Sequence, residues 1–312
     1  MNSQFLYRVY GVTLGSDMAL SLPTAPAGAA AYSQLDSGDA TDFERIRDSL
    51  PPPTDEWGQV SVLGDGSIYM RWNDWLEFVV SPDGRRISYH ALCPGPPHAF
   101  EAYLANFAVS AAMIQHGEEP LHSTVVEWKG RGFGLTGPSG AGKSSLAAHL
   151  LTRGSRLVTD DMLRLTFDGS QAFAQPGPLR LKLNADTVPI YSGALAYRGE
   201  WSPDAGKFLF EPVDATEPHE GVQISALFWL ERPGHDDAAD NTITLERLSG
   251  LDLFAVICAS TMNSRVHTPQ RLQRQMEFAK KIGDSLPVYR LTYPRRHDLL
   301  DEVVHKIESA LP

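Results

Sequence analysis

The sequence GPSGAGKS, from Gly137 to Ser144, restricts the possible fold of this chain more than any other feature. It matches the G-x-x-x-x-G-K-[ST] pattern of a phosphate-binding loop. The preceding GFGLTG has the character of a strand, and the following residues from Lys143 to Arg153 place Leu146 and Leu150 on one helical face. A strand, a glycine loop and a helix in this order predict a β-loop-α unit in a nucleotide-binding α/β domain.

The composition of this loop suits phosphate binding. Glycines let backbone N–H groups close around phosphate oxygens, and the helix N-terminus adds a favourable dipole. Lys143 would reach the outer phosphates, and the Ser144 hydroxyl would ligate Mg²⁺. The loop reads phosphates and not the base, so ATP is the donor expected by default. The residues expected to bind the nucleotide are Gly137, Ser139, Gly140, Ala141, Gly142, Lys143, Ser144 and Ser145.

Two adjacent carboxylates, Asp160 and Asp161, follow the strand-like sequence RLVT. Open α/β sheets bind ligands at the carboxyl ends of their strands, so both aspartates could lie beside the glycine loop. One carboxylate could hold Mg²⁺ while the other deprotonates an attacking hydroxyl. The alternative is a structural role, in which an aspartate caps the following helix.

Length and charge narrow the class of protein. A chain of 312 residues predicts two domains, and a net charge of −11 leaves little attraction for nucleic acid or for an anionic membrane. Only two cysteines occur, which favours a reducing compartment over a disulfide framework. The N-terminus lacks the pattern of a signal peptide and no apolar stretch is long enough to span a bilayer, so we expect a soluble, cytoplasmic protein.

The rest of the chain predicts a β-rich N-terminal domain at residues 1–97, a connecting helix at 98–118 and a mixed α/β domain at 119–312. Asp83-Gly84 separates two strand-like runs, which predicts a hairpin. Apolar residues recur at helical spacing between His98 and His116. In the C-terminal part, ISALFWLER and VYRLTY predict buried strands, and residues 269–282 and 297–311 predict helices.

A histidine and the aspartate pair stand at fixed distances from the glycine loop. His122 lies fifteen positions before Gly137, and Asp160 and Asp161 lie twenty-three and twenty-four positions after it. In this spacing the chain resembles the bacterial HPr kinase/phosphorylase superfamily, whose kinase domain is related to phosphoenolpyruvate carboxykinases. The resemblance implies that domain's fold and a catalytic set of His122, Lys143 and Asp160. His122 would lie near the phosphates, Asp160 would accept the proton of the hydroxyl, and Ser144 and Asp161 would hold Mg²⁺. Judged without this spacing, His122 would more often be a structural residue.

Two departures from that superfamily bear on the substrate. HPr kinases usually carry an acidic residue after the loop Lys-Ser, where this chain has Ser145, and their glycine-rich downstream signature is absent. The opening YRVYGVTLGSDMALSLP and the sequence EPLHSTVV are similar to the lasso peptide kinase branch. That resemblance implies transfer to a serine hydroxyl, commonly at the C-terminus of a precursor peptide, and is compatible with a homo-oligomer.

Other signals are weaker and leave alternatives open. Arg180 and Lys182 alternate along a predicted strand and could meet a phosphate or a carboxylate of the substrate, although a solvated strand face explains them too. Arg265, His267 and Arg271 form a second basic cluster at a helix start. The acceptor could instead be an HPr-like carrier protein or a small hydroxylated metabolite. In a third hypothesis, a nucleotide-dependent switch or ATPase, Glu231 would be the catalytic glutamate.

Overall fold

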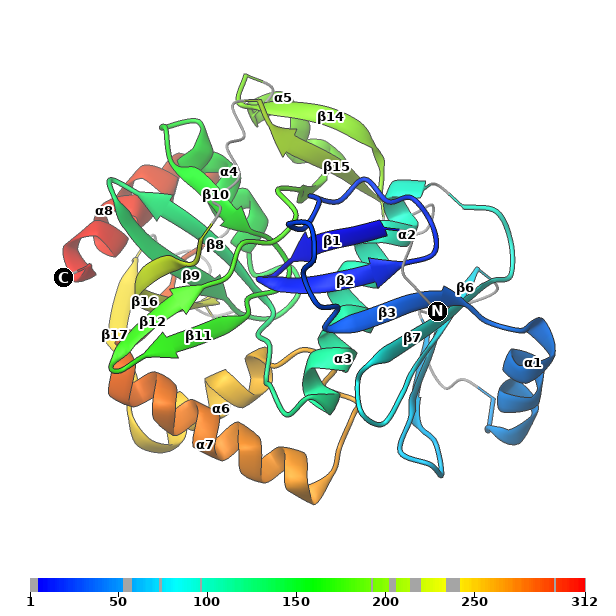
Figure 1. Cartoon of the computed structure of the whole chain (residues 1–312). Helices are drawn as coiled ribbons and strands as arrows, with labels where there is room; N and C mark the ends of the chain where they lie inside the picture. The colour runs from blue at the N-terminus through cyan, green and yellow to red at the C-terminus, as the bar shows by residue number, and fades with distance from the viewer. Residues whose placement is uncertain are drawn as a thin grey trace. The chain divides into compact units, whose positions relative to one another are not determined.

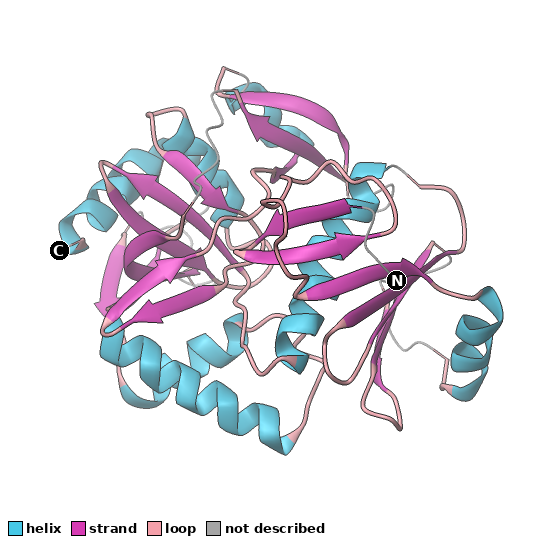
Figure 2. Cartoon of the chain, viewed as in Figure 1, coloured by secondary structure: helices cyan, strands magenta, loops and turns pink. Residues whose placement is uncertain are grey.

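The computed structural model describes residues 5–52, 58–72, 75–95, 97–191, 193–201, 206–213, 220–233, 242–294 and 296–311. The chain divides into two compact units, one of Met1–Glu119 with Met262–Leu272 and the other of Pro120–Thr261 with Gln273–Pro312. Helices and strands alternate through the second unit, whereas strands dominate the first (Figures 1 and 2). The predicted class, a β-rich N-terminal region followed by a mixed α/β domain, is confirmed.

The first unit is built on a seven-stranded sheet of order β1-β2-β3-β7-β6-β5-β4. Strand β3 pairs in parallel with β2 and β7, and the other neighbours are antiparallel. The predicted hairpin at Asp83-Gly84 joins β6 and β7. The strands are β1 (Phe5–Val9), β2 (Val12–Ser16), β3 (Ser33–Ser37), β4 (Gln59–Val62), β5 (Ile68–Trp72), β6 (Leu76–Val80) and β7 (Arg86–Ala91).

The helix predicted near residues 98–116 packs on this sheet. It consists of α2 (Pro97–Tyr103), a π-helical segment η1 (Leu104–Ala108) and α3 (Val109–Gln115). Aromatic pairs fix it to the strands: Trp72 lies 4.9 Å from Tyr103 and Phe78 lies 5.8 Å from Phe100, measured between ring centroids. The structure therefore places these residues inside the first unit and adds residues 262–272 to it. A further helix, α1 (Ala40–Ser49), was not predicted.

The second unit contains the glycine loop in a larger sheet whose central order is β10-β8-β9-β16. Strand β16 pairs in parallel with both β9 and β18. The strands of this sheet are β8 (Ser123–Trp128), β9 (Arg131–Thr136), β10 (Arg156–Thr159), β11 (Leu165–Asp168), β12 (Gln171–Ala174), β16 (Val222–Glu231), β17 (Thr244–Arg247) and β18 (Val288–Thr292).

Helices cover both faces of this sheet (Figure 1). Leu146 and Leu150 of α4 (Lys143–Leu151) pack with Val303 of α8 (Leu300–Ala310) on one face. On the other face, Ile257 of α6 (Gly250–Ser260) and Ile282 of α7 (Pro269–Ser285) close a second core. The predicted C-terminal helices are therefore confirmed, the last one opening with a 3₁₀ turn, η4 (His297–Leu299).

A separate three-stranded antiparallel sheet has the order β13-β15-β14. Its strands are β13 (Leu181–Asn184), β14 (Leu195–Glu200) and β15 (Lys207–Pro212), with η2 (Ala185–Thr187) and α5 (Val188–Tyr191) between the first two. This small sheet contributes to the site described below.

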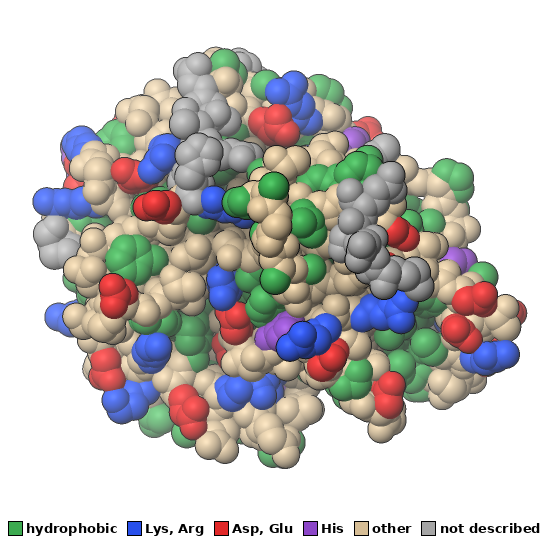
Figure 3. Space-filling model, viewed as in Figure 1, with side chains coloured by type: hydrophobic (Ala, Val, Ile, Leu, Met, Phe, Trp, Pro, Cys, Tyr) green, Lys and Arg blue, Asp and Glu red, His purple; other side chains and the backbone are tan. Residues whose placement is uncertain are grey.

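The surface and the helices give no sign of a membrane span. Within the described residues, no helix is both long and apolar enough to cross a bilayer. On the face shown in Figure 3, acidic and basic side chains are intermixed.

Candidate active site

The glycine loop follows β9 and turns directly into α4. Gly137, Gly140 and Gly142 have φ angles of 135°, 78° and 105°, values that L-residues with side chains rarely adopt. A Cβ atom on Gly137 would lie 2.7 Å from the Leu230 carbonyl oxygen. The loop therefore needs glycine both for its backbone conformation and for its close approach to β16.

Lys143 is the first residue of α4 and folds back over the loop. Its ammonium donates hydrogen bonds to the carbonyl oxygens of Gly137, at 2.8 Å, and Pro138, at 3.2 Å. The side chain is buried, and this burial lowers the pKa of Lys143 against the opposing charges of Asp161 and Asp160. Lys143 thus lies where a phosphate on the loop N–H groups would meet it.

Asp160 follows β10 at the same edge of the sheet as the glycine loop. It is buried, and its Oδ1 atom accepts a 2.5 Å hydrogen bond from the Thr124 hydroxyl. Its Oδ2 atom accepts a longer bond, 3.4 Å, from the backbone N–H of Lys182. Burial, with the neighbouring Asp161 charge, raises the pKa of Asp160 to about 7. A carboxylate with this pKa suits proton transfer near neutral pH.

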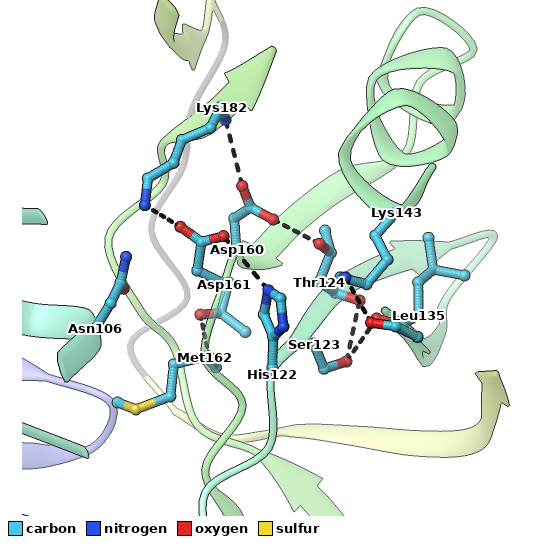
Figure 4. Close-up of polar contacts among 12 residues, drawn as sticks. Asn106, His122, Ser123, Thr124, Leu135, Lys143, Asp160, Asp161, Met162 and Lys182 are labelled. Carbon is cyan, nitrogen blue, oxygen red and sulfur yellow. Dashed lines mark hydrogen bonds and ion pairs between the residues drawn. The ribbon is translucent and has the colours of Figure 1, made fainter. Parts of the chain in front are cut away.

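Asp161 has a left-handed backbone, with φ of 64°, that turns its carboxylate towards two basic side chains. Its oxygens pair with the Lys182 ammonium and lie 4.0 Å from Nε2 of His122 (Figure 4). Burial opposes ionisation, but interactions led by the charge of Lys182 outweigh it and lower the pKa of Asp161. The two adjacent aspartates therefore differ: Asp161 stays ionised, and Asp160 can exchange a proton near pH 7.

His122 is held by its backbone just before β8. Its N–H donates a 2.6 Å hydrogen bond to the carbonyl oxygen of Ser260, and Leu121 forms bridges with Leu163 and Thr261. Burial, followed by the Lys143 charge, lowers the pKa of His122 to about 4 although Asp161 opposes this. The side chain keeps 36% of its exposure, facing the pocket. At neutral pH it is a neutral imidazole that can donate or accept a hydrogen bond.

These groups line one pocket in the second unit. The pocket contains the loop from Ser139 to Ser145 together with His122, Asp161 and Lys182, whereas the neighbouring Asp160 is buried and is not among the lining residues. Arg180 is not among the lining residues, and its Nε lies 3.6 Å from a carboxylate oxygen of Glu211. The structure thus brings together the predicted histidine, loop and aspartates, and it separates Arg180 from Lys182.

Two other groups of expected residues lie elsewhere. Glu231 ends β16, is 48% exposed and has a carboxylate oxygen 3.1 Å from Nε of Arg290. Arg265 and Arg271 belong to the first unit, where Arg271 is buried and donates to Glu119 and to three carbonyl oxygens. Neither Glu231 nor this basic cluster lines the pocket.

Several site residues had no sequence signal of their own. The pocket also contains Asn184, Thr187, Lys207, Arg232, Tyr293, Arg296 and His297. They come from separate elements, so their spacing in the sequence is uninformative. Thr124 lies on β8, two residues after His122, and no strand was predicted from the sequence at this position.

Comparison with known proteins relates this region to one family. Residues 116–178 match the family model described as HPr Serine kinase C-terminal domain. The region around the glycine loop is similar to HPr kinase/phosphorylase. The match contains His122, the glycine loop and both aspartates, so the resemblance expected at the superfamily level is confirmed.

Curated relatives show the same similarity over limited lengths. A putative HPr kinase/phosphorylase of Fusobacterium nucleatum is 38% identical over 91 residues, covering 29% of this chain and 14% of the relative. The HPr kinase/phosphorylase of Clostridium beijerinckii is 52% identical over 44 residues, or 14% of this chain and 15% of the relative. That of Clostridium novyi is 25% identical over 175 residues, or 49% and 56%. The chain thus spans little more than half of these relatives at most.

One solved structure is similar at a low level. The Hpr(Ser) kinase/phosphatase from Coxiella burnetii gives a TM-score of 0.34 at 14% identity, covering 61% of this chain and 94% of that chain. The fold described above rests on the strand order and on the helices that cover the sheet.

Proposed function

We propose that this protein is an ATP- and Mg²⁺-dependent serine kinase. The observation that carries the proposal is a phosphate-binding loop that shares a pocket with Asp161, next to Asp160, a buried carboxylate whose pKa is raised to about 7. The matched family model and the names of the relatives support the same reaction class.

The residues fit a magnesium ion bound with the nucleotide. No group of three His, Cys, Asp or Glu side chains among the described residues would make a protein-only metal site. Mg²⁺ usually binds through one or two carboxylates together with substrate phosphates and water. The ionised Asp161 and the Ser144 hydroxyl, which both line the pocket, supply that donor set. When bound, the ion would neutralise charge on the phosphates.

The chain's own residues account for the transfer. The carboxylate of Asp160 would accept the proton of a serine hydroxyl as its oxygen bonds to the γ-phosphorus. The bond between that phosphorus and the β,γ-bridging oxygen breaks, and ADP leaves with the bond's electron pair. Lys143 would leave the two loop carbonyls and stabilise the charge on the phosphates, while the neutral imidazole of His122 would donate a hydrogen bond to the moving group.

For the acceptor we propose the C-terminal serine of a peptide, as in the lasso precursor peptides that the N-terminal and pre-loop sequences suggest. A second candidate is an HPr-like carrier protein, favoured by the names of the relatives. The ATPase alternative is less favoured, because Glu231 lies outside the pocket and beside Arg290.

Intact-mass analysis separates these functions. Purified protein is incubated with Mg²⁺, ATP and either a peptide ending in serine or an HPr protein, with Asp160→Asn as the matched control. Phosphate added to the peptide serine by wild type alone supports the proposal, and phosphate added only to HPr selects the second candidate. Release of inorganic phosphate without phosphorylation of either the peptide or HPr would show that the protein is an ATPase.

A further inference from the structure

The small three-stranded sheet presents three polar side chains to the pocket. Asn184 of β13 is directly opposite Lys207 of β15, and Lys182 lies two residues before Asn184 on the same strand. Opposite residues of an antiparallel pair share a face, as do alternate residues of one strand. Lys182, Asn184 and Lys207 therefore point to one side, and all three line the pocket.

Lys207 is held in place through its backbone. Its carbonyl oxygen accepts a 3.0 Å hydrogen bond from the N–H of Trp201, and Lys182 lies 3.9 Å above the ring centroid of the same tryptophan. Trp201 is 7% exposed. The Trp201 backbone therefore holds the backbone of Lys207, and the Trp201 ring holds the ammonium of Lys182.

Of the pocket cations, Lys207 is the one without an internal partner. Lys143 binds loop carbonyls, Lys182 pairs with Asp161, Arg232 donates to Gly140, and Arg296 pairs with Asp298. Within the described residues, the Lys207 side chain makes no hydrogen bond and no close ion pair, although its charge acts at longer range on Asp161. A half-buried ammonium in this position is available to an anion that enters the pocket.

We propose that Lys207 and Asn184 form a carboxylate subsite that selects an acceptor serine with a free C-terminal carboxylate. The proposal rests on the kinase function above and specifies how its acceptor is recognised. The phosphates already have the loop, Lys143 and Mg²⁺, so Lys207 is left for a different anion. A C-terminal serine carries its hydroxyl and its carboxylate on the same residue. When its hydroxyl is next to Asp160, its carboxylate would therefore lie near the small sheet formed by β13, β15 and β14. There the ammonium and the Asn184 amide would both donate to it.

Two peptides that differ only at the C-terminus test this subsite. One ends in serine with a free carboxylate and the other ends in serine amide; kcat/KM is measured for each with wild type, Lys207→Met and Arg198→Met. Arg198 is an exposed cation on β14 of the same sheet, paired with Glu211 outside the pocket, and serves as the matched control. We expect wild type and Arg198→Met to prefer the acid by about tenfold or more, as for a charge-assisted hydrogen bond, and Lys207→Met to lose that preference.

An equal loss of kcat/KM for acid and amide in Lys207→Met would assign Lys207 to the phosphates and overturn the subsite. Anisotropy of fluorescent versions of both peptides, with Mg²⁺ and ADP present, gives a readout that does not need turnover. Tighter binding of the acid to wild type but not to Lys207→Met supports the subsite even if no phosphate is transferred, in which case the kinase proposal alone fails. If both peptides are phosphorylated equally well, the kinase proposal stands and the carboxylate subsite is contradicted. If neither peptide binds, the carboxylate subsite is also contradicted.

Discussion

The Thr124 hydroxyl donates a 2.5 Å hydrogen bond to Oδ1 of Asp160, joining β8 to the carboxyl end of β10. A hydrogen bond donated to a carboxylate stabilises its charged form, so this contact lowers the Asp160 pKa against the effects of burial and of Asp161. Thr124 thereby adjusts the pH at which the proposed base is ready to accept a proton.

Replacing Thr124 should move the pH–rate profile. In wild type we expect kcat/KM to rise through a pH of about 7 as Asp160 loses its proton. Thr124→Val removes the stabilising donor, so the Asp160 pKa and the acidic limb should shift to higher pH while activity at high pH is retained. Thr124→Ser keeps the hydroxyl and should behave as wild type. An unchanged limb in Thr124→Val would show that another group controls this ionisation.

Asp161→Asn should act in the opposite direction. Removal of the adjacent negative charge lowers the Asp160 pKa, so the acidic limb moves to lower pH. Loss of the proposed metal ligand should at the same time raise the Mg²⁺ concentration needed for half-maximal rate by about tenfold or more. Asp168→Asn, at the exposed end of β11, is the control. A normal Mg²⁺ requirement in Asp161→Asn would remove this residue from the metal site.

Asp160→Asn should abolish transfer, preserve nucleotide binding and increase thermal stability at alkaline pH. The folded pKa of about 7 exceeds the ordinary 3.8, so the unfolded chain releases its proton first as the pH rises. Between about pH 4 and pH 7 Asp160 is ionised in the unfolded chain but still protonated in the native state. The free energy of unfolding of the wild type therefore falls progressively across this interval. The Tm of the variant minus that of wild type should grow across this interval, which melting curves at pH 5 and pH 8 would measure. A constant difference would contradict a buried, weakly acidic Asp160.

Gly142→Ala should impair both stability and nucleotide binding. The φ angle of 105° disfavours any side chain, and the new methyl group would lie 3.1 Å from the Tyr293 hydroxyl. Gly154→Ala is the matched control, since its φ is 88° but no heavy atom lies within 4 Å of the added Cβ. Both variants should lose about 1–3 kcal/mol of unfolding free energy from backbone strain. Only Gly142→Ala should also weaken the binding of a fluorescent ATP analogue.

Arg271→Met should strongly destabilise the protein. Arg271 is 2% exposed and makes a 3.0 Å ion pair with Glu119, which would be left as a buried charge lacking this cation. The expected cost is about 3–5 kcal/mol. Arg45→Met, which breaks an exposed pair with Asp42, should change the Tm little. Comparable melting curves for the two variants would show that Arg271 is not essential to folding.

Local patterns predicted the centre of the site because its chemistry is encoded in short stretches. The glycine loop needs its residues in one run, and His122, Asp160 and Asp161 stand at strand ends whose spacing from the loop is fixed by the β-loop-α unit. Asn184 and Lys207 belong to different strands, and their meeting depends on a pairing register that side-chain alternation does not specify. The separation of Arg180 from the pocket was not predicted for the same reason. Alternation along the strand predicts which face Arg180 shares with Lys182, but it does not predict that Glu211 lies beside Arg180.

Domain organisation was harder to predict than the residues that meet around the glycine loop. A contiguous boundary near residue 119 agrees with the change from a β-rich to a mixed composition. No pattern in the sequence indicates that residues 262–272 return to the first unit, because that return depends on tertiary contacts such as those of Arg271. Helix α1 was not predicted because its residues are mostly polar and Phe43 is its one buried residue.

The return of residues 262–272 also limits how such a chain can be divided or recombined. A gene fragment ending at residue 119 would encode a first unit without the segment that carries Arg271, and a fragment starting at residue 120 would carry that arginine away from Glu119. The first fragment would lack part of its own unit, and the second would contain the whole second unit together with a segment that belongs to the first. A complete first unit therefore requires two separate stretches of the chain, residues 1–119 and 262–272.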